Sequence, residues 1–95
     1  MSKKTIWITG GSTGIGKALA IKFASKGWNV AISARRVELL NELSNSYENI
    51  SGFPLDVTDK EKCKEVFNEI KNKYENIDIC FFSTGTWDPK KEKDI

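Results

Sequence analysis

A glycine-rich segment near the N-terminus has the spacing that most directly suggests chemistry. Gly10, Gly14 and Gly16 form the pattern Gly-x-x-x-Gly-x-Gly, between an apolar run and a stretch with helical periodicity. A turn in that context can hold phosphates, because the N-terminus of the helix offers unpaired N–H groups and partial positive charge to an anion. We therefore predict that this loop binds the phosphates of a nucleotide.

Each glycine of the loop has an expected role. Gly10 permits a tight turn, Gly14 a close approach of the backbone to a pyrophosphate, and Gly16 a contact between helix and strand that a Cβ would obstruct. Glycine-rich turns also serve as plain connectors, but the position between a buried strand and an amphipathic helix favours phosphate binding. A P-loop is excluded, since no Gly-Lys-Ser/Thr follows.

The loop is followed by alternating strand and helix patterns. Apolar, β-rich runs occur at residues 5–9, 29–33, 51–55 and 78–82, and helical periodicity occurs at about residues 14–26, 37–47 and 58–74. The first helix is expected to pack through Ile15, Ala18, Leu19 and Phe23 and to end at Gly27. Thr58 and Glu61 form a capping-box pattern at the start of the third helix.

Strands that are apolar almost throughout and separated by helices predict a parallel sheet covered on both faces. The expected fold is α/β, in the order β-α-β-α-β-α-β. Right-handed crossovers favour strand order 3-2-1-4, with the first two helices on one face and the third on the other. The fourth strand is then an edge, and its residues 79–82 are apolar on both sides, so we expect an uncovered surface there.

Composition excludes several classes of protein. With 95 residues and a net charge of +2, the chain fits one soluble domain, and nucleic-acid or membrane binding is not indicated. The only cysteines, Cys63 and Cys80, lack a CxxC spacing, so we expect no metal site and two buried thiols in a reducing compartment. The short apolar run at residues 5–8 is no signal peptide, and the expected location is the cytoplasm.

Four motifs together resemble the short-chain dehydrogenase/reductase family, whose fold is of the Rossmann type. They are Thr-Gly-x-x-x-Gly-Ile-Gly, Arg35-Arg36 after strand two, Leu55-Asp56-Val57 after strand three, and residues 78–85 in the place of the family's Asn-Asn-Ala-Gly segment. The resemblance implies that residues 1–85 form an NADP-binding half-domain. Residues 86–95 would then be a polar tail that starts a missing C-terminal half, with the fold truncated after strand four.

The resemblance also implies how a dinucleotide is bound. The loop would contact the cofactor through Gly10, Ser12, Thr13, Gly14, Ile15 and Gly16. Where NAD-preferring relatives carry an acidic residue, this sequence has Ser33-Ala34 followed by Arg35 and Arg36. Guanidinium groups can bind a 2′-phosphate through charge-assisted hydrogen bonds, which give a preference for NADP over NAD on the order of 10- to 100-fold. NADP is therefore the expected cofactor. Alternatively, the two arginines are a solvated pair at the start of a helix.

Further contacts are implied at the next two strands. Asp56 would accept a hydrogen bond from the adenine amino group, and the Val57 backbone would contact the ring; alternatively, Asp56 only caps the following helix. Ser83, Thr84 and Gly85 would keep backbone contacts with the cofactor, although both asparagines of the family segment are replaced.

The catalytic residues of the family are not found in this sequence. Four residues beyond Tyr47 is Ser51, and four beyond Tyr74 is Asp78, so neither tyrosine belongs to the family's Tyr-x-x-x-Lys pair. We expect the N-terminal part of an NADP(H)-dependent oxidoreductase that acts on a carbonyl or alcohol, from a family of homo-oligomers. The alternatives are a non-catalytic NADP(H)-binding module acting through a partner protein, and isomerase or lyase chemistry on the same scaffold.

Overall fold

The computed structural model describes residues 3–10, 14–56 and 58–82. Its elements are β1 (Thr5–Thr9), α1 (Gly14–Ser25), β2 (Asn29–Ser33), α2 (Val37–Ser46), β3 (Ile50–Gly52), α3 (Lys60–Tyr74) and β4 (Ile79–Phe82). The strands are parallel and form one sheet in the order β3-β2-β1-β4. The predicted α/β fold of Rossmann type and its strand order are confirmed.

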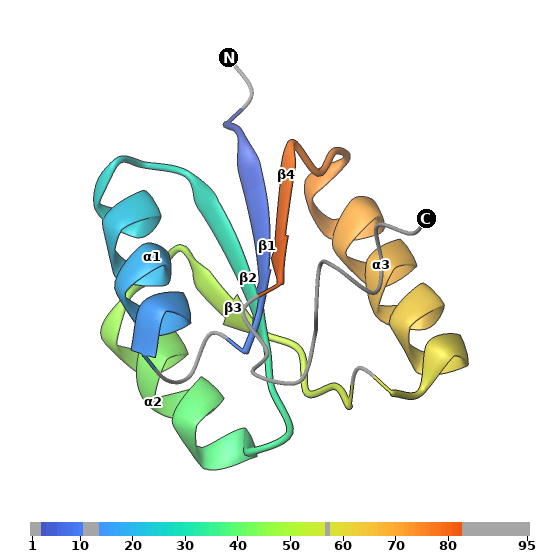
Figure 1. Cartoon of the computed structure of the whole chain (residues 1–95). Coiled ribbons are helices and arrows are strands. Elements are labelled where there is room, and N and C mark those ends of the chain that lie inside the picture. Colours follow the sequence, from blue (N-terminus) through green and yellow to red (C-terminus); the bar gives the residue numbers. More distant parts are fainter. Residues whose placement is uncertain (1–2, 11–13, 57, 83–95) are drawn as a thin grey trace, which may run out of the picture.

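The two faces of the sheet are covered by different helices, as Figure 1 shows. Alternate side chains of β1 point to opposite faces. Ile6 and Ile8 pack in the core formed with α1 and α2, whereas Trp7 packs with Val66 and Ile70 of α3. Both strands are covered on both faces, so that even the polar side chains of Thr5, Thr9 and Ser33 are buried. The predicted distribution of helices is confirmed.

Helix α1 approaches the sheet through small residues. Gly16, Ala20 and Ala24 are buried, at the i, i+4, i+8 spacing of one helical stripe. The predicted stripe is wrong in part, since Ile15 is 70% exposed and Ala18 is also exposed. Small side chains let the helix lie close to the strands, and the burial of Gly16 fits the helix–strand contact expected of it.

The end of α1 is fixed by a Schellman motif. Gly27 has a φ of 87°, in the left-handed region that favours glycine. Its N–H donates to the Ala24 carbonyl over 3.0 Å, and the Trp28 N–H donates to the Phe23 carbonyl over 3.1 Å. The Phe23 and Trp28 rings meet edge to face, 4.7 Å between centroids, so the predicted cap at Gly27 is confirmed.

Helix α3 starts differently from the prediction. The N-cap is Asp59, whose carboxylate accepts a hydrogen bond from the Lys62 N–H over 3.1 Å. The expected capping box of Thr58 and Glu61 is therefore wrong. Thr58 and Asp59 are both residue types that cap helices. The Thr58 hydroxyl bonds to Asp56, so Asp59 is the cap and the helix begins one residue later than predicted.

Strand β3 is also shorter than predicted and ends at Gly52 rather than Leu55. Pro54 lacks the N–H that a regular ladder uses. The chain nevertheless continues beside β2, because the N–H groups of Phe53 and Leu55 donate to the carbonyls of Ile32 and Ala34. This continuation carries the chain towards Asp56.

Strand β4 lies at the edge of the sheet, as predicted. Ile79 is 40% exposed, and Cys80 is exposed rather than buried. Cys63 is only partly buried, so the expectation of two buried thiols is wrong. For Cys80 the cause is the edge position of β4, which has a neighbouring strand on one side only. Within the described ranges, no helix is both long and apolar enough to cross a membrane.

The tetrapeptide Tyr-Glu-Asn-Ile occurs twice, and its two asparagines differ in surroundings. The Asn49 side-chain amide donates to the carbonyls of Ala24 and Trp28 over 2.9 and 2.7 Å, whereas Asn76 is exposed. Asn49 thereby ties the α2–β3 loop to the corner between α1 and β2.

We expect Asn49→Ala to lower the free energy of unfolding by about 1–3 kcal/mol, because two part-buried carbonyls lose their donor. Asn76→Ala is the matched control, expected to change the free energy by less than about 0.5 kcal/mol. Urea denaturation of both variants measures the difference. Equal losses would contradict the bridging role of Asn49.

Candidate cofactor site

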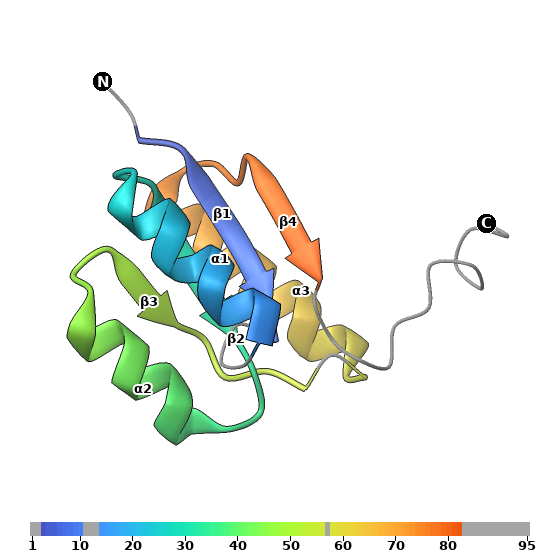
Figure 2. The ribbon, with the colours of Figure 1, turned by 60° about the vertical axis from the view of Figure 1, so that its left-hand side comes forward.

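The carboxyl ends of β1 and β2 lie at the same edge of the sheet. Thr9 is paired with Ser33, and the Gly10 N–H continues the ladder by donating to the Ser33 carbonyl over 2.6 Å. Gly10 then turns the chain with a φ of 75°, as expected of it. Figure 2 shows the start of α1 beside the end of β1.

The N-terminus of α1 is open and has no negative charge of its own. Gly14 is exposed with a φ of 53°, and a Cβ at this position would meet no atom of the described residues within 4 Å. Ile15 beside it is exposed, and the first turn of the helix holds no acidic residue. This arrangement suits an anion at the helix dipole. Ser12 and Thr13, also expected to contact the cofactor, lie outside the described residues.

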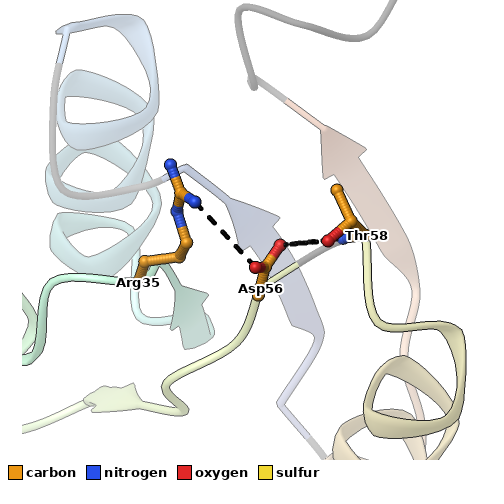
Figure 3. Close-up of polar contacts among 3 residues, drawn as sticks. All are labelled: Arg35, Asp56 and Thr58. Atoms are coloured by element: carbon orange, nitrogen blue, oxygen red, sulfur yellow. Dashed lines mark hydrogen bonds and ion pairs between the residues drawn. The ribbon is translucent and has the colours of Figure 1, made fainter.

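Arg35 and Asp56 are brought together by the pairing that continues past β2 and β3. The hydrogen bond from the Leu55 N–H to the Ala34 carbonyl, 3.0 Å, immediately precedes both residues. A guanidinium nitrogen of Arg35 then lies 3.9 Å from Oδ2 of Asp56 (Figure 3). The side chains are 77% and 45% exposed, so the pair contributes little to stability and remains accessible to a ligand.

Arg36 has a separate position at the start of α2. It is the N-cap of that helix, with extended backbone, and its side chain makes no capping hydrogen bond. It is exposed, as is Arg35. Two cations at a helix N-terminus oppose the macrodipole, so they are not there to stabilise α2.

Thr58 also belongs to the site, although the sequence pattern did not identify it as more than a helix cap. Its backbone N–H and its hydroxyl both donate to Oδ1 of Asp56, over 3.0 and 2.7 Å (Figure 3). The signal was present as Asp-x-Thr, a spacing at which an aspartate can bond to the chain two residues on. The alternative that Asp56 caps α3 is wrong, because Asp59 is the cap.

The contacts around Asp56 favour its charged form. The Thr58 backbone N–H, the Thr58 hydroxyl and, to a smaller extent, the Arg35 guanidinium hold the pKa of Asp56 below its ordinary value. The carboxylate is thus an acceptor at neutral pH. A hydrogen-bond donor of a ligand placed here would meet a negative charge already held in position.

The structure places the described candidate residues in two groups joined by the β1–β2 ladder. Gly10, Gly14, Ile15 and Gly16 lie at the β1–α1 turn, and Arg35, Arg36 and Asp56 lie at the ends of β2 and β3. Val57, Ser83, Thr84 and Gly85 lie outside the described residues. Across the part of the chain that is described, no group of three His, Cys, Asp or Glu side chains could hold a metal.

The two tyrosines are not placed for proton transfer at this edge. The Tyr74 hydroxyl is hydrogen-bonded to Oγ of Ser51 over 2.8 Å, where it links α3 to β3. Tyr47 packs against the core formed with α1 and α2.

Comparison with known proteins gives one consistent family. Residues 4–95 match the family described as short chain dehydrogenase. The uncharacterized oxidoreductase Lmo0432 of Listeria monocytogenes is 36% identical over 89 residues, which cover 90% of this chain and 36% of that protein. A probable 2,4-dienoyl-CoA reductase of Bacillus subtilis is 43% identical over 61 residues, which cover 60% of this chain and 24% of that protein.

Solved structures agree in fold. ElxO with NADP bound superposes with a TM-score of 0.80 at 39% identity, covering 87% of this chain and 35% of that one. A short-chain dehydrogenase from Streptomyces avermitilis gives a TM-score of 0.78 at 34% identity, covering 83% of this chain and 30% of that one. The chain therefore spans about a third of the length of these relatives.

We expect Thr58→Val to raise the pKa of Asp56 towards its ordinary value, because the hydroxyl that bonds to the carboxylate is removed. An NMR titration of the Asp56 side chain measures the change. Arg35→Ala is expected to raise this pKa by less, since the guanidinium has the smaller influence. A larger shift with Arg35→Ala than with Thr58→Val would reverse that order.

Proposed function

This chain belongs to the short-chain dehydrogenase family, and we propose that it forms the part of such an oxidoreductase that binds NADP(H). The observation that carries the proposal is the position of Arg35 beside Asp56, at the carboxyl ends of neighbouring parallel strands. In open α/β sheets, nucleotides bind outside the carboxyl ends of the strands. The chain spans only about a third of the length of its relatives, so the activity of the whole protein is proposed as well.

The proposed binding mode follows the order of the strands. The pyrophosphate lies at the N-terminus of α1, where Gly14 leaves the backbone open to it. The adenine amino group would donate to Asp56, and the Val57 backbone would contact the ring. Ser12 and Thr13 would contribute to the loop, and Ser83, Thr84 and Gly85 would contact the cofactor after β4.

We propose NADP(H) rather than NAD(H) because the end of β2 holds cations and no carboxylate. Ser33 is buried and accepts a hydrogen bond from the Trp7 indole, so it cannot face a ribose. The next charged groups along the chain are the exposed guanidinium groups of Arg35 and Arg36. They suit a 2′-phosphate, and the similar protein ElxO has been solved with NADP bound.

The proposed reaction is hydride transfer between NADP(H) and a carbonyl or alcohol. The nicotinamide supplies the hydride chemistry when the cofactor is bound. Within the present sequence, the residues described above bind and orient the cofactor, and none is proposed as the general acid. The family's tyrosine and lysine would perform that step in the whole protein, which we propose to be cytoplasmic and homo-oligomeric.

A second candidate is a non-catalytic NADP(H)-binding module that acts through a partner protein. The observation that favours it is the exposed edge of β4, with Ile79 and Cys80 open. This chain holds no proposed general acid, so the two candidates differ only for the whole protein, which is to be incubated with NADPH and a panel of aldehydes and ketones. Oxidation of NADPH that depends on the carbonyl compound would rule out the non-catalytic module.

We expect the double variant Arg35→Asp with Arg36→Ala to shift preference from NADPH towards NADH. The ratio of the Kd for NADH to the Kd for NADPH should fall by about 10- to 100-fold, the effect expected when charge-assisted hydrogen bonds to a 2′-phosphate are lost. Titration of the full chain with each cofactor, followed by cofactor fluorescence, measures both constants.

The matched control is Lys71→Asp with Lys73→Ala in the last turn of α3. It changes the net charge by the same amount at exposed positions away from the ends of β2 and β3. Its ratio should stay within about 2-fold of the unchanged chain, because screening weakens distant charges. An unchanged ratio in the arginine variant would remove these residues from the 2′-phosphate site.

A further inference from the structure

We propose that Thr58 is a positioning residue for cofactor selectivity. By holding one oxygen of Asp56, it directs the other oxygen to Arg35, so that the adenine and the 2′-phosphate are recognised by one connected unit of three side chains. The inference rests on the proposed function and deepens it. It adds Thr58, which was not among the expected cofactor contacts, as a residue that sets the preference for NADP(H) over NAD(H).

Thr58 fixes the orientation of the Asp56 carboxylate. Rotation about the terminal bond of an aspartate is normally broad. Here the Thr58 N–H and hydroxyl both donate to Oδ1, at 3.0 and 2.7 Å, and both donors belong to one residue two positions on. Two short bonds to the same oxygen leave the carboxylate with one favoured orientation.

The orientation of the Asp56 carboxylate in turn affects Arg35. With Oδ1 occupied, Oδ2 is the oxygen that faces the guanidinium, at 3.9 Å (Figure 3). Arg35 is otherwise 77% exposed on a long side chain. The contact biases it towards the edge of the sheet where we place the adenine ribose. A guanidinium carries five N–H donors, so those not directed at Asp56 remain for a phosphate.

Thr58 does not cap α3, so its role is distinct from stabilising that helix. Thr58 is exposed, and the N-cap of α3 is Asp59, which bonds to the Lys62 N–H. Removing the Thr58 hydroxyl therefore leaves the start of the helix capped. Its backbone N–H also still bonds to Asp56, so the substitution loosens the carboxylate without abolishing the turn.

The test measures the Kd of the full chain for NADPH and for NADH. We expect Thr58→Val to lower the ratio of the Kd for NADH to the Kd for NADPH by about 3- to 10-fold, the size expected for the loss of one hydrogen bond. Thr58→Ser keeps the hydroxyl and should restore the ratio to within about 2-fold of the unchanged chain.

Asp59→Ala is the matched control on the neighbouring residue. It removes the cap of α3 and should lower the melting temperature, while the Kd ratio stays unchanged. Combining Thr58→Val with Arg35→Ala tests whether Thr58 acts through Arg35. In the Arg35→Ala background, Thr58→Val should no longer change the ratio of the two Kd values.

The outcomes separate the inference from the function on which it rests. If Thr58→Val weakens both cofactors equally, or still changes the ratio without Arg35, the positioning role is overturned while NADP(H) binding stands. If Asp59→Ala lowers the ratio as much as Thr58→Val does, the effect is one of local stability, and the inference fails. If the unchanged chain binds neither cofactor, the proposed function itself is falsified.

Discussion

The parallel ladder between β1 and β2 places the glycine turn and the arginine pair at one edge of the sheet. Its register pairs Thr5 with Asn29 and Thr9 with Ser33, and the Gly10 N–H adds one more bond at the carboxyl end. Two strands in parallel must end at the same edge, so the glycine turn after one and the arginines after the other become neighbours. The sheet thus brings together residues that are some twenty positions apart in the chain.

Burial of both faces of the β1–β2 ladder fixes this register. Ile6, Ile8, Val30 and Ile32 are buried against α1 and α2, while Trp7 and Ala31 face α3. A shift by one residue would exchange the two sets and place the Trp7 indole where smaller side chains pack. The bond from the Trp7 indole N–H to the Ser33 hydroxyl, 2.9 Å, satisfies both polar groups inside the core.

Much of the fold could be predicted from the sequence, and the errors have specific causes. Strands β1 and β2 were predicted at their observed bounds because the centres of buried strands are apolar, and the handedness of the crossovers predicted the strand order. Large apolar residues were expected to pack α1 against the sheet, but the tight contact is made by Gly16 and two alanines. Local pattern alone does not decide between Thr58 and Asp59 as a cap.

The same limit applies to the candidate site. Glycine spacing and the arginine pair are local signals, so these positions could be named in advance. The approach of Arg35 to Asp56 depends on how the chain continues beside β2 after Pro54, which is a tertiary contact. Thr58 was missed for a different reason: its hydroxyl has two local roles open to it, capping α3 or bonding to Asp56, and the local sequence does not select between them.

The Asn49 bridge also has a consequence for the motions of the molecule. Its side chain holds the end of α1 and the start of β2, while its carbonyl accepts the Val30 N–H. Separating any one of these segments breaks bonds to the others, so they are expected to open together as one cooperative unit. Amide protons around this corner should then exchange with solvent at similar rates, although they belong to two successive crossover connections.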